Sequence, residues 1–380
     1  MGKYMGKKIN IFFAGDFCSK PSTSQITVSE ELKNIIQSCD LKVVNFEVPL
    51  KPDIKLPSQI RERFFQYDDT PCFLRKLGFN LFSMANNHAF DWGIEGYKKT
   101  KAALGDESFG AGTYEEAYKP KIVDVNGIKI GFLGLSYSAY TGVFDDVARH
   151  DGYGCAYIND LRVNHDIIKA KKKLDYLFII PHDGIEYIDA PLPETIARYR
   201  DFIDYGADGV FAAHPHCPQG WETYKDKPIF YSLGNFLFNS KEGYDFKASK
   251  PHWYEGLCVV LSIMNGSLSW EILNTKNVNN RRIEIDHKED RNRHNELICS
   301  YLKEVQLYYE YLLPVLKKQV EDDIGRIEQV MYPQNVIGVV KALIVFLARK
   351  ITKRTLHREV LLYMLKDDLK RSRLFRIMNL

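Results

Sequence analysis

The 380-residue sequence has no closely spaced pair of cysteines. Its seven cysteines are odd in number and scattered along the chain, and no CxxC motif occurs among them. Disulfide frameworks and cysteine-based zinc sites need cysteines in paired spacings. The sequence therefore favours reduced thiols and a cytoplasmic location.

Long apolar runs are also lacking. No uncharged apolar stretch reaches the roughly 18 residues expected of a membrane-spanning helix. The basic N-terminus leads into an apolar run of only five residues, Ile11 to Gly15, which is too short for the apolar core of a signal peptide. We therefore predict neither a membrane span nor a secretory leader.

Neither positive nor negative charge dominates the chain, but the two are unevenly distributed along it. Residues 341–380 hold eleven Lys or Arg and three acidic residues, and because the net formal charge is +3, residues 1–340 carry −5. An acidic body without an aromatic and basic stripe does not favour nucleic acid as a partner. The segment 336–354 suits either peripheral contact with an anionic membrane or packing as an amphipathic helix with a solvated basic face.

Short apolar runs that alternate with helical patterns are abundant. The apolar runs lie at 9–15, 41–46, 80–85, 128–135, 174–180, 208–213 and 228–234, and helical periodicity occurs at 28–38, 94–104, 160–173 and 193–205. This alternation predicts an α/β core.

The Asn-Gly pairs at 126–127 and 265–266 predict hairpin turns, so we expect a mixed sheet or two stacked sheets. After residue 286 the sequence becomes charged and helical. We therefore predict one domain over 1–286 and a helical, basic C-terminal module over 287–380.

Polar residues with metal-binding side chains follow the apolar runs. They are Asp16, Asn45, Glu47, Asn86, Asn87, His88, Asp91, His182, Glu186, His214, His216, Ser232 and Asn235. Ligand sites in α/β sheets lie beyond the carboxyl ends of the strands, so these side chains have a common place to meet. Imidazole, carboxylate and amide donors without a thiolate pair suit Mn, Fe or Zn. One such residue alone would more often form a turn or a helix cap. Their recurrence after several strands predicts a metal site.

Two short motifs carry more detailed expectations. His214 and His216 are two residues apart, and residues i and i+2 of an extended segment share a face, so both imidazoles could point toward the site. We expect Asn86 and Asp91 to shape the turn after the third apolar run and to cap the helix that follows.

The order of the motifs resembles that of a known family. "GD", "NFE", "ANNHAFDWG", "HDGIEY", "AHPH" and "YSLGNF" occur in the order found in CapA-type proteins of capsule and poly-γ-glutamate biosynthesis, which belong to the calcineurin-like metallophosphoesterase superfamily. The resemblance covers residues 9–240. It implies a four-layer α/β/β/α sandwich with a dinuclear metal centre at one edge, here followed by a helical C-terminal extension.

The resemblance also assigns roles to individual residues. Asp16 and His216 would bind the first metal, Glu47 would bridge, and the second metal would be held by Asn87, His182 and His214. His88 would contact the scissile phosphate and would protonate or stabilise the leaving group. Glu186 and Asn235 match motif positions that line the pocket. We place Glu186 with His88 among the catalytic residues, and Asn45 with Asn235 among those that bind the cofactor.

Two positions depart from the superfamily pattern. Its usual Asp-x-His motif is replaced by Asp16-Phe17-Cys18, as is general in CapA-type members, which leaves the first metal short of a ligand. Cys18 could be a soft ligand, but a buried thiol is the favoured interpretation. Asp183 stands where an aromatic residue usually precedes glycine, and it would make the pocket more acidic.

These observations predict a metal-dependent hydrolase with two divalent metal ions. A metal-bound hydroxide would attack a phosphate ester, or an amide or ester of a precursor of a capsule or cell-surface polymer. The alternative is a non-hydrolytic assembly or binding factor in the same biosynthesis. The expected partner is a small molecule or polymer precursor. The location would be cytoplasmic, with peripheral membrane contact through the basic C-terminal helices.

Overall fold

The computed structural model describes residues 8–20, 22–54, 64–138, 152–239, 252–304 and 306–318. The chain divides into two units, Met1–Ser300 and Tyr301–Leu380. In the second unit, residues 306–318 are helical. The basic segment for which membrane contact is predicted lies outside the described residues, and the domain boundary at residue 286 stays a prediction.

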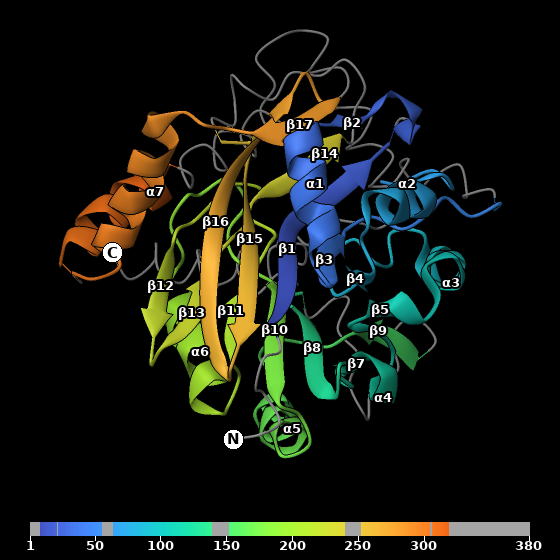
Figure 1. Cartoon of the computed structure of the whole chain (residues 1–380), viewed down its shortest axis with the longest axis horizontal. Coiled ribbons are helices and arrows are strands. Elements are labelled where there is room, and N and C mark those ends of the chain that lie inside the picture. Colours follow the sequence, from blue (N-terminus) through green and yellow to red (C-terminus); the bar gives the residue numbers. More distant parts are fainter. Residues whose placement is uncertain are drawn as a thin grey trace, which may run out of the picture. The chain divides into compact units, whose positions relative to one another are not determined.

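Two mixed β-sheets form the centre of the first unit (Figure 1). The described strands of the larger sheet are, in spatial order, β2 (Thr27–Val28), β17 (Arg282–Ile285), β16 (Ser267–Val278), β15 (Glu255–Met264), β1 (Lys8–Ser19), β3 (Leu41–Phe46), β4 (Leu81–Ser83) and β5 (Ser108–Phe109), and β14 (Asn235–Asn239) also pairs with β1. Those of the second sheet are β12 (Trp221–Tyr224), β13 (Lys227–Phe230), β11 (Gly209–Phe211), β10 (Tyr176–His182), β8 (Ile128–Ser136) and β7 (Lys121–Val125). A small sheet pairs β6 (Ala111–Thr113) with β9 (Tyr153–Cys155).

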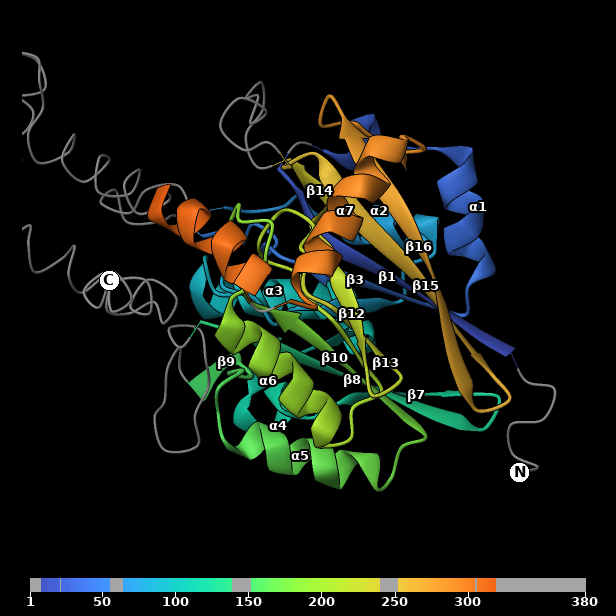
Figure 2. The ribbon, with the colours of Figure 1, turned by 90° about the vertical axis from the view of Figure 1, so that its left-hand side faces the viewer.

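Most of the described helices lie on the outer faces of the two sheets (Figure 2). Their bounds are α1 (Glu30–Ser38), α2 (Thr70–Leu77), α3 (Gly93–Leu104), α4 (Tyr114–Ala117), α5 (Arg162–Lys171), α6 (Pro193–Asp204) and α7 (Glu289–Tyr301), with 3-10 turns η2 (Thr23–Gln25) and η3 (Gly105–Glu107). Leu32 of α1, Leu74 of α2 and Tyr97 of α3 share one apolar core with the outer face of the larger sheet. On the other side α5 packs against β10, and α6 against β11 and β13. The predicted four-layer α/β/β/α sandwich is confirmed.

The inner faces of the two sheets bury a core rich in aromatic side chains. Phe13 of β1 stacks on Phe211 of β11 with ring centroids 3.7 Å apart, and it meets Phe178 of β10 edge-on at 5.7 Å. Such ring pairs add about 0.5–1.5 kcal/mol beyond the area they bury. The pairing fixes β1, which carries Asp16, against the second sheet, whose strand β10 ends in His182.

Both predicted hairpins are confirmed. Asn126 and Gly127 join antiparallel β7 and β8, and Asn265 and Gly266 join antiparallel β15 and β16. All four residues have positive φ angles, between 52° and 86°. Asn and Gly tolerate this left-handed backbone, which the tightest hairpin turns require. The seven predicted strands and four predicted helices are also present, with ends shifted by a few residues.

No helix in the part of the chain that the structure describes is long and apolar enough to cross a membrane.

Candidate metal centre

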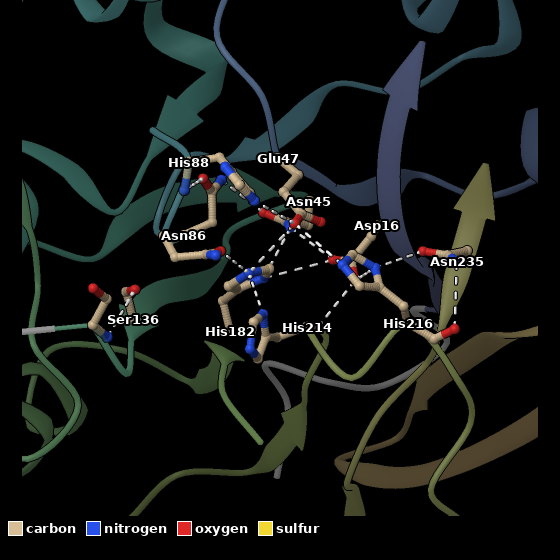
Figure 3. Close-up of polar contacts among 12 residues, drawn as sticks. Asp16, Asn45, Glu47, Asn86, His88, Ser136, His182, His214, His216 and Asn235 are labelled. Carbon is tan, nitrogen blue, oxygen red and sulfur yellow. Dashed lines mark hydrogen bonds and ion pairs between the residues drawn. The ribbon is translucent and has the colours of Figure 1, made fainter. Parts of the chain in front are cut away.

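The polar residues predicted at the strand ends come together at the carboxyl ends of parallel strands from both sheets (Figure 3). Asp16 lies in β1 and Asn45 in β3, His182 ends β10, and Asn235 begins β14. The remaining residues lie in the loops that follow β3, β4, β10 and β11: Glu47, Asn86, Asn87, His88, Glu186, His214 and His216. Ser232 instead accepts a hydrogen bond from the Gly234 N–H and shapes a turn.

Glu47 is the residue that two groups of potential metal ligands share. One group consists of Asp16, Glu47 and His216, the other of Glu47, His182 and His214, and all of these residues are buried. The Glu47 Oε1 atom lies 3.6 Å from His216 Nε2, 3.8 Å from His182 Nε2 and 4.0 Å from His88 Nε2. Among the described residues, Glu47 is therefore the member common to both groups of donors.

Asp16 is fixed from several sides. Its Oδ1 accepts a hydrogen bond from Asn45 Nδ2 at 2.7 Å, and its Oδ2 accepts one from the His214 backbone N–H at 3.0 Å. The Asp16 N–H donates to Gly234 O at 3.0 Å. Asn45 also contacts His182 Nδ1 at 3.1 Å, so its amide links Asp16 to His182.

In the second group of potential ligands, His182 contacts both Asn87 and His214. Its Nε2 lies 2.8 Å from Asn87 Oδ1 and 3.1 Å from His214 Nδ1. His214 packs against Tyr137, with ring centroids 4.5 Å apart. The amide oxygen of Asn87 therefore lies beside the two imidazoles with which the resemblance groups it.

His216 is held by an amide and by aromatic rings. Its Nδ1 lies 2.9 Å from Asn235 Oδ1, and Asn235 Nδ2 donates to Trp253 O at 2.9 Å. The Trp253 and Phe238 rings lie 5.0 Å and 4.5 Å from the His216 ring. Asn235 thus orients His216 from behind.

The expectation that His214 and His216 share a face of an extended segment is wrong. β11 ends at Phe211, and both histidines have positive φ angles, 104° and 57°. The tight turn between them sends the two imidazoles to different ligand groups. Hydrogen bonds to Asp16 and Asn235 compensate for the unfavourable backbone conformation.

His88 lies next to the two ligand groups, and a carboxylate orients it. Its Nδ1 lies 2.8 Å from Asp91 Oδ2, while its Nε2 faces Glu47. The expected helix cap is wrong, because α3 begins at Gly93 and its N-cap residue is Trp92, whose side chain makes no capping hydrogen bond to the helix. Asn86 does shape the turn, since its Oδ1 accepts from the His88 N–H at 3.1 Å and its Nδ2 donates to Phe46 O.

Glu186 is half-buried on the loop after β10. Its charge contributes to raising the pKa of both Glu47 and His88, which places it electrostatically near the two residues.

The two buried carboxylates titrate in opposite directions. Burial by itself would raise the pKa of Asp16, but the interactions with His182 and His216 hold that pKa well below its usual range. Burial, followed by repulsion from Asp16, raises the pKa of Glu47 well above its usual range. Burial also lowers the pKa of His182 and, more strongly, that of His214, so both imidazoles are neutral near pH 7. Neutral imidazole is the form that binds a metal.

A divalent cation fits this set of donors. Both carboxylate oxygens of Glu47 are buried and make no hydrogen bond in the described structure. Donors on a common cation, each bonded at about 2.0–2.2 Å, lie roughly 3–4 Å apart. The separations of 3.6 Å and 3.8 Å from Glu47 to His216 and His182 are in this range. The site therefore has the ligand types and the unsatisfied buried charge that a cation would complete.

A sequence model of the family described as bacterial capsule synthesis protein PGA_cap matches residues 10–240. The chain belongs to this capsule synthesis family. Capsule biosynthesis protein CapA of Bacillus anthracis is 31% identical to it over 223 residues, 56% of this chain and 53% of that protein. PGA biosynthesis protein CapA of Bacillus subtilis (strain 168) is 28% identical over 249 residues, 62% of this chain and 65% of that protein. The aligned part is thus less than two thirds of either relative's length.

Solved structures with similar folds include two phosphoesterases. A phosphatase from Mycoplasma pneumoniae has a TM-score of 0.40 at 14% identity, and the match covers 71% of this chain and 94% of that one. A 5′-nucleotidase precursor from Thermus thermophilus has a TM-score of 0.41 at 12% identity, with coverages of 70% and 54%.

In this member of the capsule synthesis family, Cys18 is surrounded by apolar side chains. It is fully buried with Val48, Phe238 and Trp253. Burial, together with the charge of Glu47, raises the pKa of its thiol well above the usual range. A protonated thiol in an apolar cluster fits a packing role better than metal ligation.

The second departure, Asp183, does not add an exposed acid to the site. It is buried and accepts a hydrogen bond from Thr195 of α6 at 3.4 Å. Burial raises the pKa of Asp183 to about 6, although hydrogen bonds to the Gly184 backbone and Thr195 act in the opposite direction.

Sequence reasoning missed the aromatic residues that line the centre. Trp253 follows the last recognised motif, and Phe64 comes well before the "NNH" motif, yet their rings contact His216 and His88, at 5.0 Å and 5.1 Å. Neither lies in a segment whose pattern indicates a site.

Proposed function

We propose that this protein is a metal-dependent hydrolase acting on a precursor of a capsule or other cell-surface polymer. The observation that carries the proposal is the buried Glu47 carboxylate, shared by two ligand groups and accepting no hydrogen bond in the described structure. Membership of the capsule synthesis family supports the choice of a polymer precursor, with poly-γ-glutamate as the example that the relatives' names suggest.

Each ligand group would hold one divalent cation, Mn, Fe or Zn. Asp16, His216 and Glu47 would form one site, and Glu47, His182, His214 and Asn87 the other. Cations in these sites would polarise the electrophile and lower the pKa of water to near neutrality. Asn45 and Asn235 would keep the ligands in place, because their amides contact Asp16, His182 and His216.

His88 would donate a proton to the leaving atom, which makes it the catalytic acid. The Asp91 carboxylate contacts its Nδ1, so the Nε2 atom faces the ligand groups. Burial lowers the pKa of His88, but the charge and hydrogen bond of Asp91 more than offset this, so the pKa is raised overall. A raised pKa keeps the proton available near neutral pH. Glu186 would act at the same side of the pocket.

The electrophile is either a phosphate ester or an amide or ester of the precursor. The deciding experiment combines metal analysis of the purified protein with turnover of aryl phosphate monoesters and diesters and of a γ-glutamyl anilide in the presence of Mn²⁺. We expect close to two metal equivalents, and turnover that is lost in His88→Ala and His216→Ala. Turnover confined to one substrate type identifies the electrophile.

The second candidate is a non-hydrolytic assembly or binding factor in the same biosynthesis. The apolar surroundings of Cys18 favour it, because they leave Asp16, Glu47 and His216 as the donors of the first group. Bound metal without turnover of any of these substrates would support this candidate.

We also propose a cytoplasmic location with peripheral membrane contact through the basic C-terminal segment. Sedimentation of the full chain with anionic vesicles, compared with a chain ending at residue 318, tests that contact.

A further inference from the structure

Two lysines follow the two proposed metal-binding carboxylates at the same spacing. Lys20 comes four residues after Asp16, and Lys51 comes four residues after Glu47. Their Nζ atoms lie 5.1 Å and 4.6 Å from the centroid of the Phe65 ring. Two ammonium groups, from the segments that follow β1 and β3, therefore converge on one aromatic side chain.

The Phe65 ring is rigidly connected to the surroundings of His88. Phe65 is buried and meets Trp92 edge-on, with ring centroids 5.9 Å apart. The Trp92 indole N–H donates to Phe64 O at 2.9 Å, and the Phe64 ring lies 5.1 Å from the His88 ring. Adjacent residues thus contact the catalytic acid on one side and the lysines on the other.

The backbone beside each lysine is held by one buried side chain. Gln66 Oε1 accepts from the Ser19 N–H at 3.0 Å, and Gln66 Nε2 donates to Val48 O at 2.7 Å. The Lys51 N–H also donates to Gln66 O at 3.0 Å. The backbone from which the two lysines project is consequently held in place by Gln66, and this lowers part of the entropic cost of binding.

The positive charge of Lys51 is available to a ligand. No carboxylate in the described ranges lies within ion-pair distance of its Nζ, which contacts only the Phe65 and Trp92 rings. By contrast, nearby Lys99 pairs with Asp68 at 2.9 Å. An ammonium over a ring face keeps hydrogen-bond donors free for an anion. Lys51 also lines a surface hollow of about 400 Å³, together with Asp53 and the paired Asp68 and Lys99.

We infer that Lys51, assisted by Lys20, forms a subsite for an anionic group of the substrate that is separate from the group bound at the metal centre. The inference rests on the proposed function and specifies its substrate class, a chain that carries a second anionic group beside the scissile bond. Carboxylate and phosphate satisfy an ammonium group equally well. The polymer precursor proposed above would bring a carboxylate.

The test is calorimetric titration of the full-length, chelator-treated protein with tri-γ-glutamate and, separately, with inorganic tripolyphosphate. We expect binding in at least one arm, weakened about tenfold or more in Lys51→Met, further in Lys20→Met/Lys51→Met, and retained in Lys51→Arg. Asp53→Asn should strengthen binding, because it removes a negative charge from the same hollow. Lys33→Met, on the outer surface of α1, serves as the control.

The two arms identify the anion. Tri-γ-glutamate alone indicates a carboxylate subsite, and tripolyphosphate alone indicates a phosphate subsite. No binding of either, or equal weakening in Lys51→Met and Lys33→Met, would overturn the inference. Unchanged melting temperatures establish that the variants are folded.

Failure of the subsite and failure of the proposed hydrolase are distinguishable. A protein that binds an anion through Lys51 but hydrolyses nothing refutes the hydrolase and leaves the subsite. A hydrolase whose KM for a multiply charged substrate does not change in Lys51→Met refutes the subsite and leaves the hydrolase.

Discussion

Glu47 shows at the scale of one residue why a cation would suit the site. Its carboxylate is completely buried and makes no hydrogen bond in the described structure. A buried, ionised carboxylate that accepts no hydrogen bond destabilises the folded state. The raised pKa of Glu47 reflects the same cost. A bound cation would neutralise the carboxylate, so metal binding and folding stability should be coupled.

We expect metal to stabilise the wild-type protein and to have little effect on Glu47→Gln. At a free Mn²⁺ concentration 100 times the Kd of a site, the free energy of unfolding of the wild type should rise by about 2.7 kcal/mol for each site that fills. Glu47→Gln removes the ligand that both groups share, so its gain should be below about 1 kcal/mol. Thermal unfolding with Mn²⁺ and with chelator measures both values. His165→Gln, on α5, is the control, and a wild type unaffected by metal would contradict the prediction.

If His88 is the proposed catalytic acid, Asp91 positions it, and replacement of Asp91 should affect turnover more than substrate binding. Asp91→Asn keeps the shape of the side chain but removes the charge that orients His88 and supports its protonated form. We expect kcat to fall about 100-fold, the lower range for loss of general acid catalysis, with KM nearly unchanged. Steady-state kinetics with Mn²⁺ measures the two constants.

The exposed Asp106, changed to Asn, provides the matched control for Asp91→Asn. If Asp91→Asn lowers metal content as much as it lowers kcat, the residue holds the loop together and does not act through His88.

At the scale of elements, the site depends on the close approach of β1 and the turn before β14. A Cβ atom on Gly15 would lie 1.9 Å from Gly234 O, the same oxygen that accepts from the Asp16 N–H. Any side chain at position 15 must therefore separate the two segments and displace Asp16.

Gly15→Ala should consequently weaken metal binding as well as folding. We expect a loss of about 1–3 kcal/mol in the free energy of unfolding, as for other overpacked sites, together with lower Mn²⁺ affinity. Gly105→Ala is the comparison, because its Cβ would meet open space and only its φ of +60° causes strain. It should cost stability without changing metal affinity. Equal Mn²⁺ affinity in the two variants would show that the close approach is not needed for the site.

At the scale of the whole molecule, the contacts of α7 determine where the first unit ends. Ile298 of α7 is buried and contacts Gly220, and the Trp221 N–H donates to Cys299 Sγ at 3.3 Å. Asn295 Nδ2 donates to Asn274 Oδ1 at 2.8 Å. Residues 289–300 therefore belong to the first unit through their contacts with β12 and β16.

Two truncations test the consequence. A chain of residues 1–300 should fold and keep its metal content. A chain of residues 1–286 should be less stable by at least about 1.5–3 kcal/mol, the value of burying one large aliphatic side chain. Denaturant unfolding of both fragments gives the difference. Equal stabilities would place the boundary near residue 286, as the sequence pattern predicts.

Much of the fold could be predicted because it depends on local pattern. The apolar runs that became β1, β3 and β10 are short and bounded by polar or glycine residues, which is typical of strands buried on both faces. The turns at Asn126 and Asn265 follow from residues that tolerate positive φ. The β12–β13 hairpin was missed because Lys225 and Asp226, with φ of 48° and 61°, give no such signal.

The types of side chain at the centre could likewise be predicted from the residues that follow each strand. The spatial arrangement of these side chains could not. The sequence by itself determined the α/β class, the family and the types of donor, because these depend on periodicity and on motif order. Only the tertiary structure decided that His214 and His216 lie on a turn with positive φ angles, that Asp91 orients His88, and that Lys20 and Lys51 meet at Phe65. The physical reason is that side-chain direction in a loop is set by long-range hydrogen bonds and packing, such as the bond from the His214 N–H to Asp16, and local sequence does not encode them.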